Sequence, residues 1–532
     1  MNNKINKLSI VILGFLVFVA VALFFLSNSY SYSDVDLGWH LRIGQDILKS
    51  GQVPVFNDYN YTLSGQKWVD HEWLLNAGMA LLFNHGKFIN LHLVFLLVLL
   101  VTAFFVWRRN INLLGNKIVF KLGSAIWLFL GLLASRPHLG IRVQEFGLLG
   151  MAILFWIFSG PSRSRHYFWY LPPIFWLWAN IHGSFLLGLA LLGAYCIYAF
   201  ASPLFKHVNH WQLFRVDSFD LKFKKQLLVI FTLSVLATLI NPYGVDLYAF
   251  LGTYTHTTYM VYIREWQSQF VFPLFYVQIF YLALAAVALI MLIKDRRRNL
   301  FIFSWWEAFL FVFFFILAIK SRRHFPLFVL ASLPFLSVAF QEFSAQIIGL
   351  VKRCRSLIWR ALAIFLMFIL VIYQAVNIPW LQNSIQDFCG RKYPCAAVEY
   401  LRARPDLLNK RLFNSYDWGG YLLWAYPERQ IFIDGRMPQA EYRHHTILEE
   451  YLRFRSGSED IGNLLNTYQI DLVLLKKSVG PLALRSWEKL FFQISEEELT
   501  APDYLRLYLD SSLDWQVVFE DNISIIYERQ KN

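Results

Sequence analysis

Long apolar runs recur through the first 378 residues, and they constrain the fold of this chain more than any other feature of its sequence. We count about eleven runs, each close to the roughly 20 residues that an α-helix needs to cross a lipid bilayer. Only 16% of the 532 residues are charged, whereas soluble domains carry about 25%. A polytopic α-helical membrane domain over residues 1–378 is therefore expected. The runs lie near 8–27, 88–107, 118–134, 144–160, 167–181, 183–201, 226–240, 273–293, 302–319, 325–341 and 357–377.

Two details of the runs affect the topology. No small-residue cleavage site follows the first run, so we interpret it as a retained signal-anchor helix. Asn180, His182 and Gly183 interrupt the fifth and sixth runs, which leaves two alternatives. The runs are either two helices joined by a tight turn or one kinked element.

The basic residues between the runs indicate how the chain is oriented. With the N-terminus in the cytoplasm, five clusters of Lys and Arg fall on the cytoplasmic side, as the positive-inside rule requires. An odd number of spans then places everything after about residue 378 outside the cytoplasm. The net charge of +13 lies largely in these clusters and reflects topology and attraction to anionic lipid, so no nucleic-acid partner is expected.

The C-terminal region, residues 379–532, is polar and mixed in charge. About 150 residues suffice for one domain with its own core. We predict an extracytoplasmic α/β domain, in which Cys389 and Cys395 can form a disulfide if the compartment is oxidising. Strand-like runs occur at 411–416, 419–426, 430–435, 470–477, 515–520 and 523–529, and helical spacing occurs at 396–403 and 449–455.

The first outer loop, residues 28–87, is far longer than a connection between two helices needs to be. It is also much richer in acids and histidine than the rest of the membrane half. One helical pattern starts at Asp36, and a second starts at Asp70 or His71. We therefore expect two short interfacial helices, each with carboxylates at its start.

Two explanations exist for these carboxylates. Asp36 and Asp70 are favoured as helix N-caps, each worth about 1 kcal/mol. However, Asp34 places a second acid beside Asp36, and Asp70, His71 and Glu72 form a row of titratable side chains. Clustered acids repel one another unless a cation, a proton or a substrate binds there. We predict function for Asp36 first, then for Asp34, His71 and Glu72.

Three outer connections, 135–142, 264–266 and 320–325, carry arginine where the positive-inside rule disfavours it. Binding of an anionic group is one explanation. Snorkelling toward outer headgroups, or pairing with loop carboxylates, is the other. The candidates for anion binding are Arg322, Arg323, His324 and Arg136.

Several segments resemble the GT-C superfamily of membrane glycosyltransferases, which includes protein O-mannosyltransferases, aminoarabinose transferases and oligosaccharyltransferases. The many spans, the long first outer loop and the acidic motif directly after the first span are features of that superfamily. The first loop also resembles that of bacterial GT-C-like proteins. The segments that carry the resemblance are SDVDLGWHLRIG (33–44), PVFNDYNYTLSGQKWVDHEWL (54–74), WANIHGSFLLG (178–188), NPYG (241–244), REW (264–266), SRRHFPLF (321–328) and FNSYDWGGYLLW (413–424).

The resemblance implies an enzyme of the bacterial inner membrane that takes a sugar from a polyprenyl-phosphate-linked donor on the outer leaflet. The acceptor would be a lipid, a glycan or a protein. The resemblance further implies that Asp36 is the base for the acceptor and that Asp34 is its partner. The leaving phosphate then needs cationic stabilisation from the outer basic loops.

Some members of the superfamily bind a divalent metal near such acids. This makes Asp34, Asp36 and Glu72 candidate ligands for Mg, Mn or Ca. The remaining candidates for substrate binding are His40, Asp70, His138, Asn180, His182, Arg264 and Glu265.

Other functions fit the sequence less well. A transporter or flippase of lipid-linked glycans would need ionisable groups near mid-membrane and repeated halves. An O-antigen-type polymerase or ligase would favour a long loop later in the chain. A non-catalytic envelope-assembly protein would act through its C-terminal domain. No Walker motif, dinucleotide fingerprint or nucleophile elbow occurs, so a cytoplasmic nucleotide-sugar enzyme is not expected.

Overall fold

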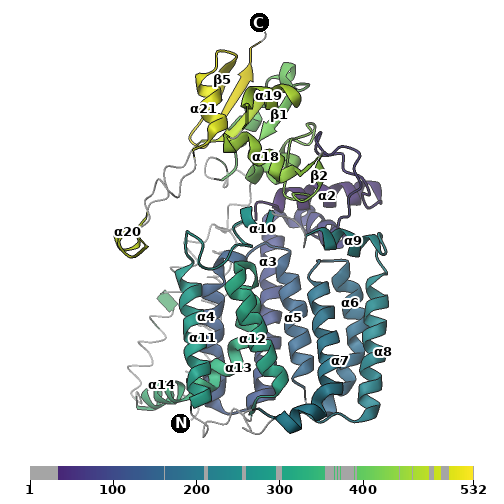
Figure 1. Ribbon diagram of the computed structural model, residues 1–532, viewed down its shortest axis with the longest axis vertical. Coiled ribbons are helices and arrows are strands. Elements are labelled where there is room, and N and C mark those ends of the chain that lie inside the picture. Colours follow the sequence, from purple (N-terminus) through teal and green to yellow (C-terminus); the bar gives the residue numbers. More distant parts are fainter. Residues whose placement is uncertain are drawn as a thin grey trace. The chain divides into compact units, whose positions relative to one another are not determined.

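The structure is a computed structural model (Figure 1). The predicted spans at 8–27 and, apart from four isolated positions, 357–377 lie outside the described residues. The structure describes residues 34–160, 162–208, 214–254, 259–294, 302–353, 365, 368–369, 372, 389, 392–442, 444–457, 459–477, 484–492 and 502–530.

The chain divides into two compact units. The helical unit contains Ile89–Val245 and Val261–Leu381, and the α/β unit contains Asp34–Phe88, Asp246–Met260 and Gln382–Asn532. This division differs from the predicted boundary at 378/379, because the first outer loop belongs with the C-terminal region.

Hydrogen bonds between the first loop and the C-terminal region explain that difference. The backbone N–H of Tyr61 donates to the carbonyl of Ile431 (3.2 Å), and the hydroxyl of Thr62 donates to the carbonyl of Phe432 (2.6 Å). The loop therefore completes the α/β unit with its own backbone and side chains.

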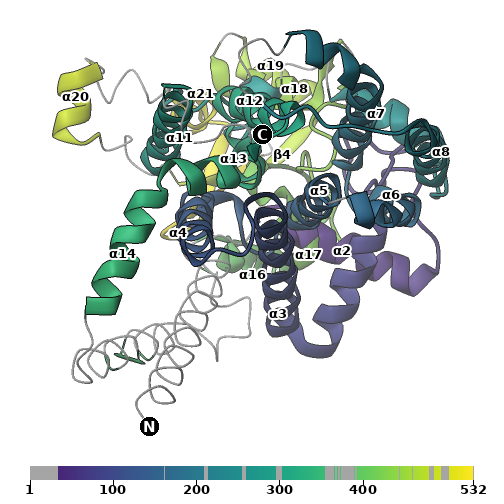
Figure 2. The same ribbon diagram turned by 90° about the horizontal axis from the view of Figure 1, so that it is seen from below.

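Helix α13 (Phe325–Ala339) forms the centre of the helical unit, and all but one of its residues are buried. It packs against α4, α5, α11 and α12, which Figure 2 shows nearly end-on. Helices α6 and α7 both pack against α8. The bounds are α3 (Trp73–Leu114, beginning in the α/β unit), α4 (Ile118–Ala134), α5 (Gln144–Phe158), α6 (Leu171–Ala179), α7 (Phe185–Val208), α8 (Leu221–Thr238), α10 (Tyr259–Tyr262, also beginning in the α/β unit), α11 (Tyr276–Lys294), α12 (Trp305–Lys320) and α14 (Gln341–Arg353).

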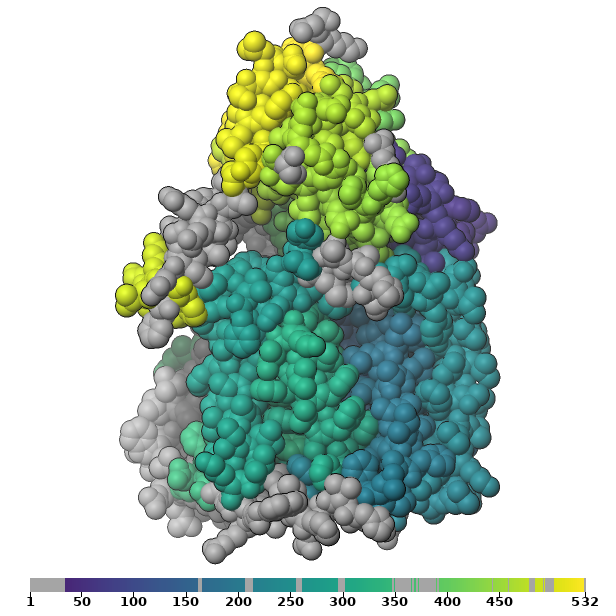
Figure 3. Space-filling model, viewed as in Figure 1, coloured from purple at the N-terminus to yellow at the C-terminus, as the bar shows by residue number. Residues whose placement is uncertain are grey.

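The apolar helices of this unit support a membrane location. Among the described residues, α3, α11 and Phe185–Phe205 of α7 are long and apolar enough to cross a bilayer, while α4 and α5 are apolar but shorter. Large apolar side chains are also exposed on this unit, including Phe280 and Ile290 of α11. Figure 3 shows part of the surface of this unit in blue and teal. Such exposure is expected of helices that contact lipid. The number of eleven spans remains a prediction.

The fifth and sixth predicted runs are two helices joined by a tight turn. Helix α6 ends at Ala179, and α7 begins at Phe185. Asn180 donates to the carbonyls of Trp176 (2.8 Å) and Ile240 (3.0 Å), so its amide satisfies backbone groups left open at the helix end.

A buried ion pair joins four helices of the helical unit. Arg109 of α3 pairs with Glu307 of α12, and their side chains are only 1% and 2% exposed. Arg109 also donates to the carbonyl of Leu330 in α13, and its guanidinium lies 5.1 Å from the ring of Phe155 in α5. The positive charge is thus compensated inside an apolar environment.

The α/β unit contains a four-stranded sheet with the order β1-β4-β6-β5. Strand β1 (Arg411–Asn414) pairs in parallel with β4 (Ile470–Lys476), and β5 (Trp515–Glu520) and β6 (Ser524–Arg529) complete the sheet in antiparallel pairs. Strand β4 is buried along almost its entire length, as expected of a central strand. The helices of this unit that follow in the chain are α16 (Cys395–Arg402), α18 (Ile447–Ser456), α19 (Ile461–Thr467), α20 (Ser486–Phe492) and α21 (Tyr504–Ser511), with a small pair of strands β2 (Glu441–Tyr442) and β3 (His445–Thr446).

Two predicted strands were wrong. Residues 419–426 form helix α17 (Gly419–Ala425), because a pair of glycines allows it to pack closely on α2 (Leu37–Ser50). A Cβ at Gly420 would lie only 2.6 Å from the carbonyl oxygen of Val35. Residues 430–435 are largely buried but form no strand, and within the described chain they make a single bridge, from Ile431 to Asn60.

The helices of the first loop follow the predicted starts. Helix α2 runs from Leu37 to Ser50 and ends at Gly51, whose φ of 68° favours glycine. The second helix is the beginning of α3, and non-helical dihedral angles at Gly86 and Lys87 mark its break before the apolar run. Helix α9 (Asp246–Thr253) belongs to the same unit.

Candidate active site

Asp36 stands at the start of α2, but its side chain does not cap the helix. It occupies the N-cap position with helical dihedral angles and makes no side-chain capping hydrogen bond. Asp34 makes the local bond instead, because its Oδ1 accepts from the backbone N–H of Asp36 (3.2 Å). The cap explanation therefore does not account for the carboxylate of Asp36, which is half-buried.

A glycine makes room for the Asp36 carboxylate. A Cβ at Gly435 would overlap with Oδ1 of Asp36, so a larger residue at position 435 would displace this carboxylate. Burial raises the pKa of Tyr416, and the negative charges of Asp36 and Asp434 raise it further. The phenol of Tyr416 therefore stays protonated and can donate hydrogen bonds near these carboxylates.

Asp434 and Arg436 form a buried cage with the first loop. The guanidinium of Arg436 donates to both carboxylate oxygens of Asp434 (2.9 and 2.7 Å), to Asn57 (3.0 Å) and to Asn60 (2.7 Å). Asn60 returns a hydrogen bond to Asp434 (2.8 Å). Because charge-assisted bidentate bonds are strong and directional, this cage fixes the backbone on both sides of Gly435.

Behind the start of α2 lies a chain of buried polar side chains. The amide nitrogen of Asn76 donates to both oxygens of Asp70 (2.9 and 2.8 Å), so its amide oxygen faces Nδ1 of His40 (2.7 Å). His40 must therefore donate through Nδ1, which leaves Nε2 as the acceptor of the neutral ring. Burial raises the pKa of Asp70 to about 6 and lowers the pKa of His40 to about 4.

The predicted row of Asp70, His71 and Glu72 divides between two environments. Asp70 and Glu72 are buried, whereas His71 is half-buried and lies near the ring of Phe250 in α9. Glu72 lies 3.5 Å from Nε2 of His71 and 3.9 Å from Nδ1 of His40. Glu72 therefore lies between the two histidines.

A disulfide holds the segment that supports Asp34. Cys389 and Cys395 are bonded, with their Cα atoms 5.3 Å apart. Within this loop the hydroxyl of Tyr393 donates to the backbone carbonyl of Asp34 (3.2 Å), and its ring stacks on Tyr421 at 4.5 Å. From the sequence, the disulfide was a possibility that depended on an oxidising compartment. Nothing in the sequence indicated that Tyr393 contacts Asp34.

A second group of candidates lies in the helical unit. Glu265 pairs with Arg142, and its carbonyl accepts from the backbone N–H of Arg323 (2.8 Å). Burial would raise the pKa of Glu265, but the charges of Arg142 and Arg323 outweigh it and hold the pKa at about 2. Burial lowers the pKa of His138 to about 4.

Arg322 differs from the other arginines of this group. Its side chain is completely buried, with the guanidinium 4.7 Å from the ring of Phe275. One terminal nitrogen donates to the carbonyl of Val271, while Nε and Nη1 have no hydrogen-bond partner among the described residues. An unsatisfied buried guanidinium is costly, and an anion would satisfy it.

The other predicted residues of the helical unit make local contacts. Arg136 and His138 form the short turn η1 (Arg136–His138), and Arg322, Arg323 and His324 form η5 (Arg322–His324). Arg323 and His324 lie near the ring of Trp266, at 4.8 and 5.9 Å. Nδ1 of His182 lies 2.7 Å from the hydroxyl of Ser184, within the turn between α6 and α7.

No family model matches the chain, and no curated protein sequence matches it. Solved structures do match. The oligosaccharyltransferase of Archaeoglobus fulgidus in its apo form aligns with a TM-score of 0.53 and 11% identity, over 88% of this chain and 69% of the other. The archaeal enzyme with an inhibitory peptide and a dolichol-phosphate gives 0.52 and 12%, over 88% and 69%. The form tethered to an acceptor peptide gives 0.53 and 11%, over 98% and 74%.

The fold of this chain is similar to that of the archaeal oligosaccharyltransferase. This agrees with the GT-C architecture that the sequence resembles, and at 11–12% identity the likeness concerns the fold alone. Within this fold the predicted residues fall into two groups, one in each unit. The α/β unit holds Asp34, Asp36, His40, Asp70, His71 and Glu72, and the helical unit holds Arg136, His138, Asn180, His182, Arg264, Glu265, Arg322, Arg323 and His324.

Asp34, Asp36 and Glu72 are also the predicted ligands of a divalent metal. In the part of the chain that the structure describes, no three His, Cys, Asp or Glu side chains come together to hold a metal ion. Asp34, Asp36 and Glu72 thus do not form such a group, and Oδ1 of Asp34 is engaged by the backbone of Asp36.

Sequence reasoning missed the residues that support the predicted ones. Asn76 is an amide inside a helical pattern, and Arg436 follows what reads as a turn. Both act through contacts with residues distant in sequence, for which local patterns give no signal. Arg142 was part of a recognised basic connection, and its partner Glu265 could have been found from opposite charge on neighbouring outer loops.

Proposed function

We propose that this protein is a membrane glycosyltransferase that moves a sugar from a polyprenyl-phosphate-linked donor to an acceptor on the extracytoplasmic face of the bacterial plasma membrane. One observation carries the proposal. In a chain whose fold is similar to that of an oligosaccharyltransferase, the carboxylate of Asp36 is held at the start of α2 without capping it, beside Gly435. The archaeal neighbour bound to a dolichol-phosphate supports a lipid-linked donor.

Asp36 is the proposed base. The nucleophilic atom of the acceptor forms a bond to the anomeric carbon of the donor sugar, and the bond between that carbon and the phosphate oxygen breaks. The electron pair of the broken bond leaves with the polyprenyl phosphate. Asp36 takes the proton that the acceptor atom loses, which is a general-base role suited to an ionised carboxylate.

The neighbours of Asp36 have positioning roles in this proposal. The Asp434–Arg436 cage supports the backbone at Gly435, and Asp34 fixes the backbone of Asp36. A base must lie within hydrogen-bond reach of the proton that it accepts, so small displacements of its carboxylate reduce the rate strongly.

The basic group of the helical unit is proposed to bind the donor phosphate. Arg322 supports this role, because its buried Nε and Nη1 have no partner among the described residues. Arg323 and His324 share the turn η5 with Arg322, and Arg136 lies in the turn η1. Cationic donors of this kind stabilise the negative charge that develops on the leaving phosphate.

The decisive experiment replaces Asp36 by Asn in the full chain. The assay reconstitutes the protein in liposomes with lipid-linked glycans extracted from the membranes of its source, and follows transfer to endogenous acceptors. Asp36→Asn should lower the rate about 100- to 10,000-fold, because general-base catalysis contributes that much. The thermal unfolding midpoint should stay close to that of the wild type, since Asp36 makes no capping bond.

Asp514→Asn is a matched control, because Asp514 is an exposed carboxylate of the same unit. This variant should retain full activity. Wild-type activity in Asp36→Asn would refute the assignment of the base.

A further inference from the structure

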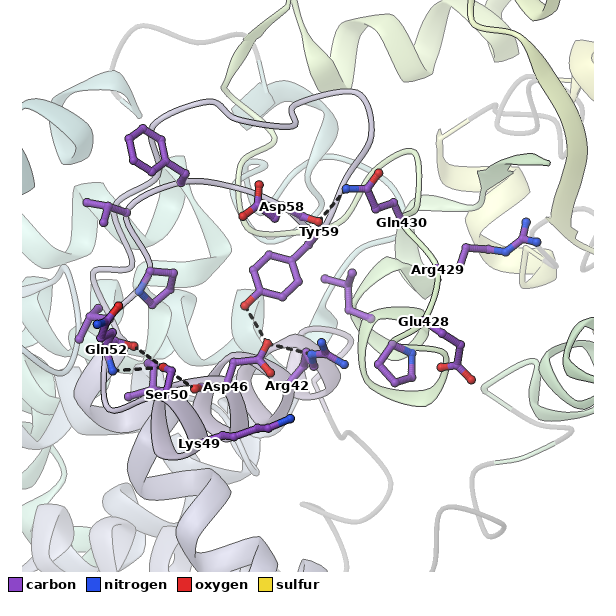
Figure 4. Close-up of a pocket in the computed structure, with 17 residues that line it drawn as sticks. Arg42, Asp46, Lys49, Ser50, Gln52, Asp58, Tyr59, Glu428, Arg429 and Gln430 are labelled. Carbon is purple, nitrogen blue, oxygen red and sulfur yellow. Dashed lines mark hydrogen bonds and ion pairs between the residues drawn. The ribbon is translucent and has the colours of Figure 1, made fainter. Parts of the chain in front are cut away.

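The α/β unit contains a cavity that the proposed chemistry does not use. It has a volume of about 700 Å³, within the range of small-molecule sites. We call it the α2 groove, because one wall is the face of α2 that carries Arg42, Asp46 and Lys49. The loop through Tyr59 and the segment 427–430 form the other walls, as Figure 4 shows.

A hydrogen-bond donor, Arg42, and a hydrogen-bond acceptor, Asp46, lie next to each other in this groove. Oδ2 of Asp46 accepts from Nε of Arg42 (2.9 Å) and from the hydroxyl of Tyr59 (2.8 Å). Among the described residues, Oδ1 of Asp46 and both terminal nitrogens of Arg42 make no hydrogen bond. The Arg42 and Asp46 side chains are 26% and 35% exposed, so these atoms are accessible to a ligand.

The walls of the groove are held in place before any ligand binds. The ring of Tyr59 packs 4.5 Å from the guanidinium of Arg436, which belongs to the Asp434–Arg436 cage. The side chain of Gln430 donates to the carbonyl of Asp58 (2.9 Å) and joins the two other walls (Figure 4). A preorganised site loses less entropy when it binds its ligand.

The charges of the lining indicate what kind of ligand fits. The lining residues include three cationic and three acidic ones, so a strongly charged ligand would gain little. A lipid chain would leave the polar groups unsatisfied. A sugar hydroxyl both donates and accepts hydrogen bonds, and the pair formed by Arg42 and Asp46 offers both partners. Phe56, 57% exposed, offers a ring for the apolar face of a pyranose.

We infer that the α2 groove binds a neutral oligosaccharide through Arg42, Asp46 and Tyr59. This inference rests on the proposed function for the source of the glycan, which is either the distal sugars of the lipid-linked donor or a glycan acceptor. Arg42 follows Asp36 by six residues, about 9 Å along the helix axis. The groove therefore holds sugars that are removed from the bond being formed.

Arg42→Ala tests the inference in the liposome assay. Because the groove contributes binding and not chemistry, the variant should raise KM about tenfold and leave kcat unchanged. Donor and acceptor are titrated separately. If the KM for the donor rises, but not when the donor is a single-sugar polyprenyl phosphate, the groove binds the distal sugars of the donor. If the KM for the acceptor rises, the groove binds a glycan acceptor. If neither KM changes, the inference is wrong.

The chain offers a matched control. Arg506 bonds Asp510 at the same i, i+4 spacing (3.5 Å), and Asp510 likewise accepts from a tyrosine hydroxyl, that of Tyr527 (2.5 Å). These residues do not line the groove. Arg506→Ala should leave both KM values unchanged, and an equal increase in this variant would contradict a specific role of the groove.

A second readout separates this inference from the proposed function. If the wild type transfers no sugar, the proposed function fails. The glycan released from the same lipid-linked extract is then added to the protein, and hydrogen exchange is followed over residues 50–59. Protection in the wild type that is lost in Arg42→Ala supports the groove as a glycan site. Absence of protection in the wild type overturns it.

Discussion

Single side chains around Asp36 illustrate how burial changes protonation. The unperturbed pKa values of Asp70 and His40 are 3.8 and 6.5, whereas the folded values are about 6 and about 4. Ionisation of Asp70 in the folded protein removes stability as the pH rises from about 4 through about 6. Protonation of His40 removes stability as the pH falls from about 6.5 through about 4. The two effects oppose each other over the same interval and largely cancel.

Asp70→Asn and His40→Gln should separate these effects. Relative to the wild type, Asp70→Asn should lose stability as the pH falls from about 6.5 to about 4, because the His40 effect remains alone. His40→Gln should lose stability as the pH rises from about 4 to about 6. Each change is on the order of 3 kcal/mol over the interval. Thermal unfolding of the solubilised protein between about pH 4 and pH 7 measures both changes. If stability depends on pH in the same way in the wild type and both variants, these two pH effects are ruled out.

At the scale of elements, glycines determine how closely the start of α2 approaches the C-terminal region. Gly420 meets the backbone carbonyl of Val35, while Gly435 meets the side chain of Asp36. A backbone contact can be relieved only by moving an element. A side-chain contact can be relieved by rotating the side chain.

Gly420→Ala and Gly435→Ala should therefore behave differently. Gly420→Ala forces α17 away from α2 and should destabilise the α/β unit by about 1–3 kcal/mol. Gly435→Ala displaces the Asp36 carboxylate and should lower transfer at least tenfold with little loss of stability. Unfolding midpoints and transfer rates of the two variants distinguish the effects. Equal losses of stability in both would show that Gly435 has only a packing role.

For the whole molecule, apolar periodicity predicted the helical unit and most of the α/β unit. Strands β1, β4, β5 and β6 lie where alternating apolar residues predicted them. The prediction failed where contacts between distant segments decide the structure. Residues 419–426 have the apolar content of a strand, yet their two glycines let them pack as a helix on α2. For the same reason the sequence did not indicate that the first loop forms one compact unit with the C-terminal region, since no local pattern reveals that it binds residues 431–436.

The candidate site was predictable to a similar degree. The position of Asp36 directly after the first apolar run singled it out, and the arginines of the outer turns stood out against the positive-inside rule. Asn76, Tyr416 and Arg436 were not found, because their roles depend on contacts that form only in the folded chain.

The stability of the helical unit depends on the ion pair between Arg109 and Glu307. Glu307→Ala would leave the guanidinium uncompensated among four apolar helices and should cost about 3–5 kcal/mol. Thermal unfolding in detergent measures the loss. Glu342→Ala is the control, because Glu342 is exposed rather than enclosed in the helical core and should have a small effect. Comparable losses in the two variants would refute a special role of the pair.

The Asp434–Arg436 cage also has a consequence for the order of events during synthesis. The hydrogen bond between Asn60 and Asp434 joins positions 374 residues apart. At about 5–20 residues per second, a ribosome needs roughly 20–75 seconds to make the intervening chain. During that time the first loop has been made but lacks the residues that enclose it. An incomplete chain therefore carries Asp36 without the support that orients it, and the base becomes competent only when translation is nearly finished.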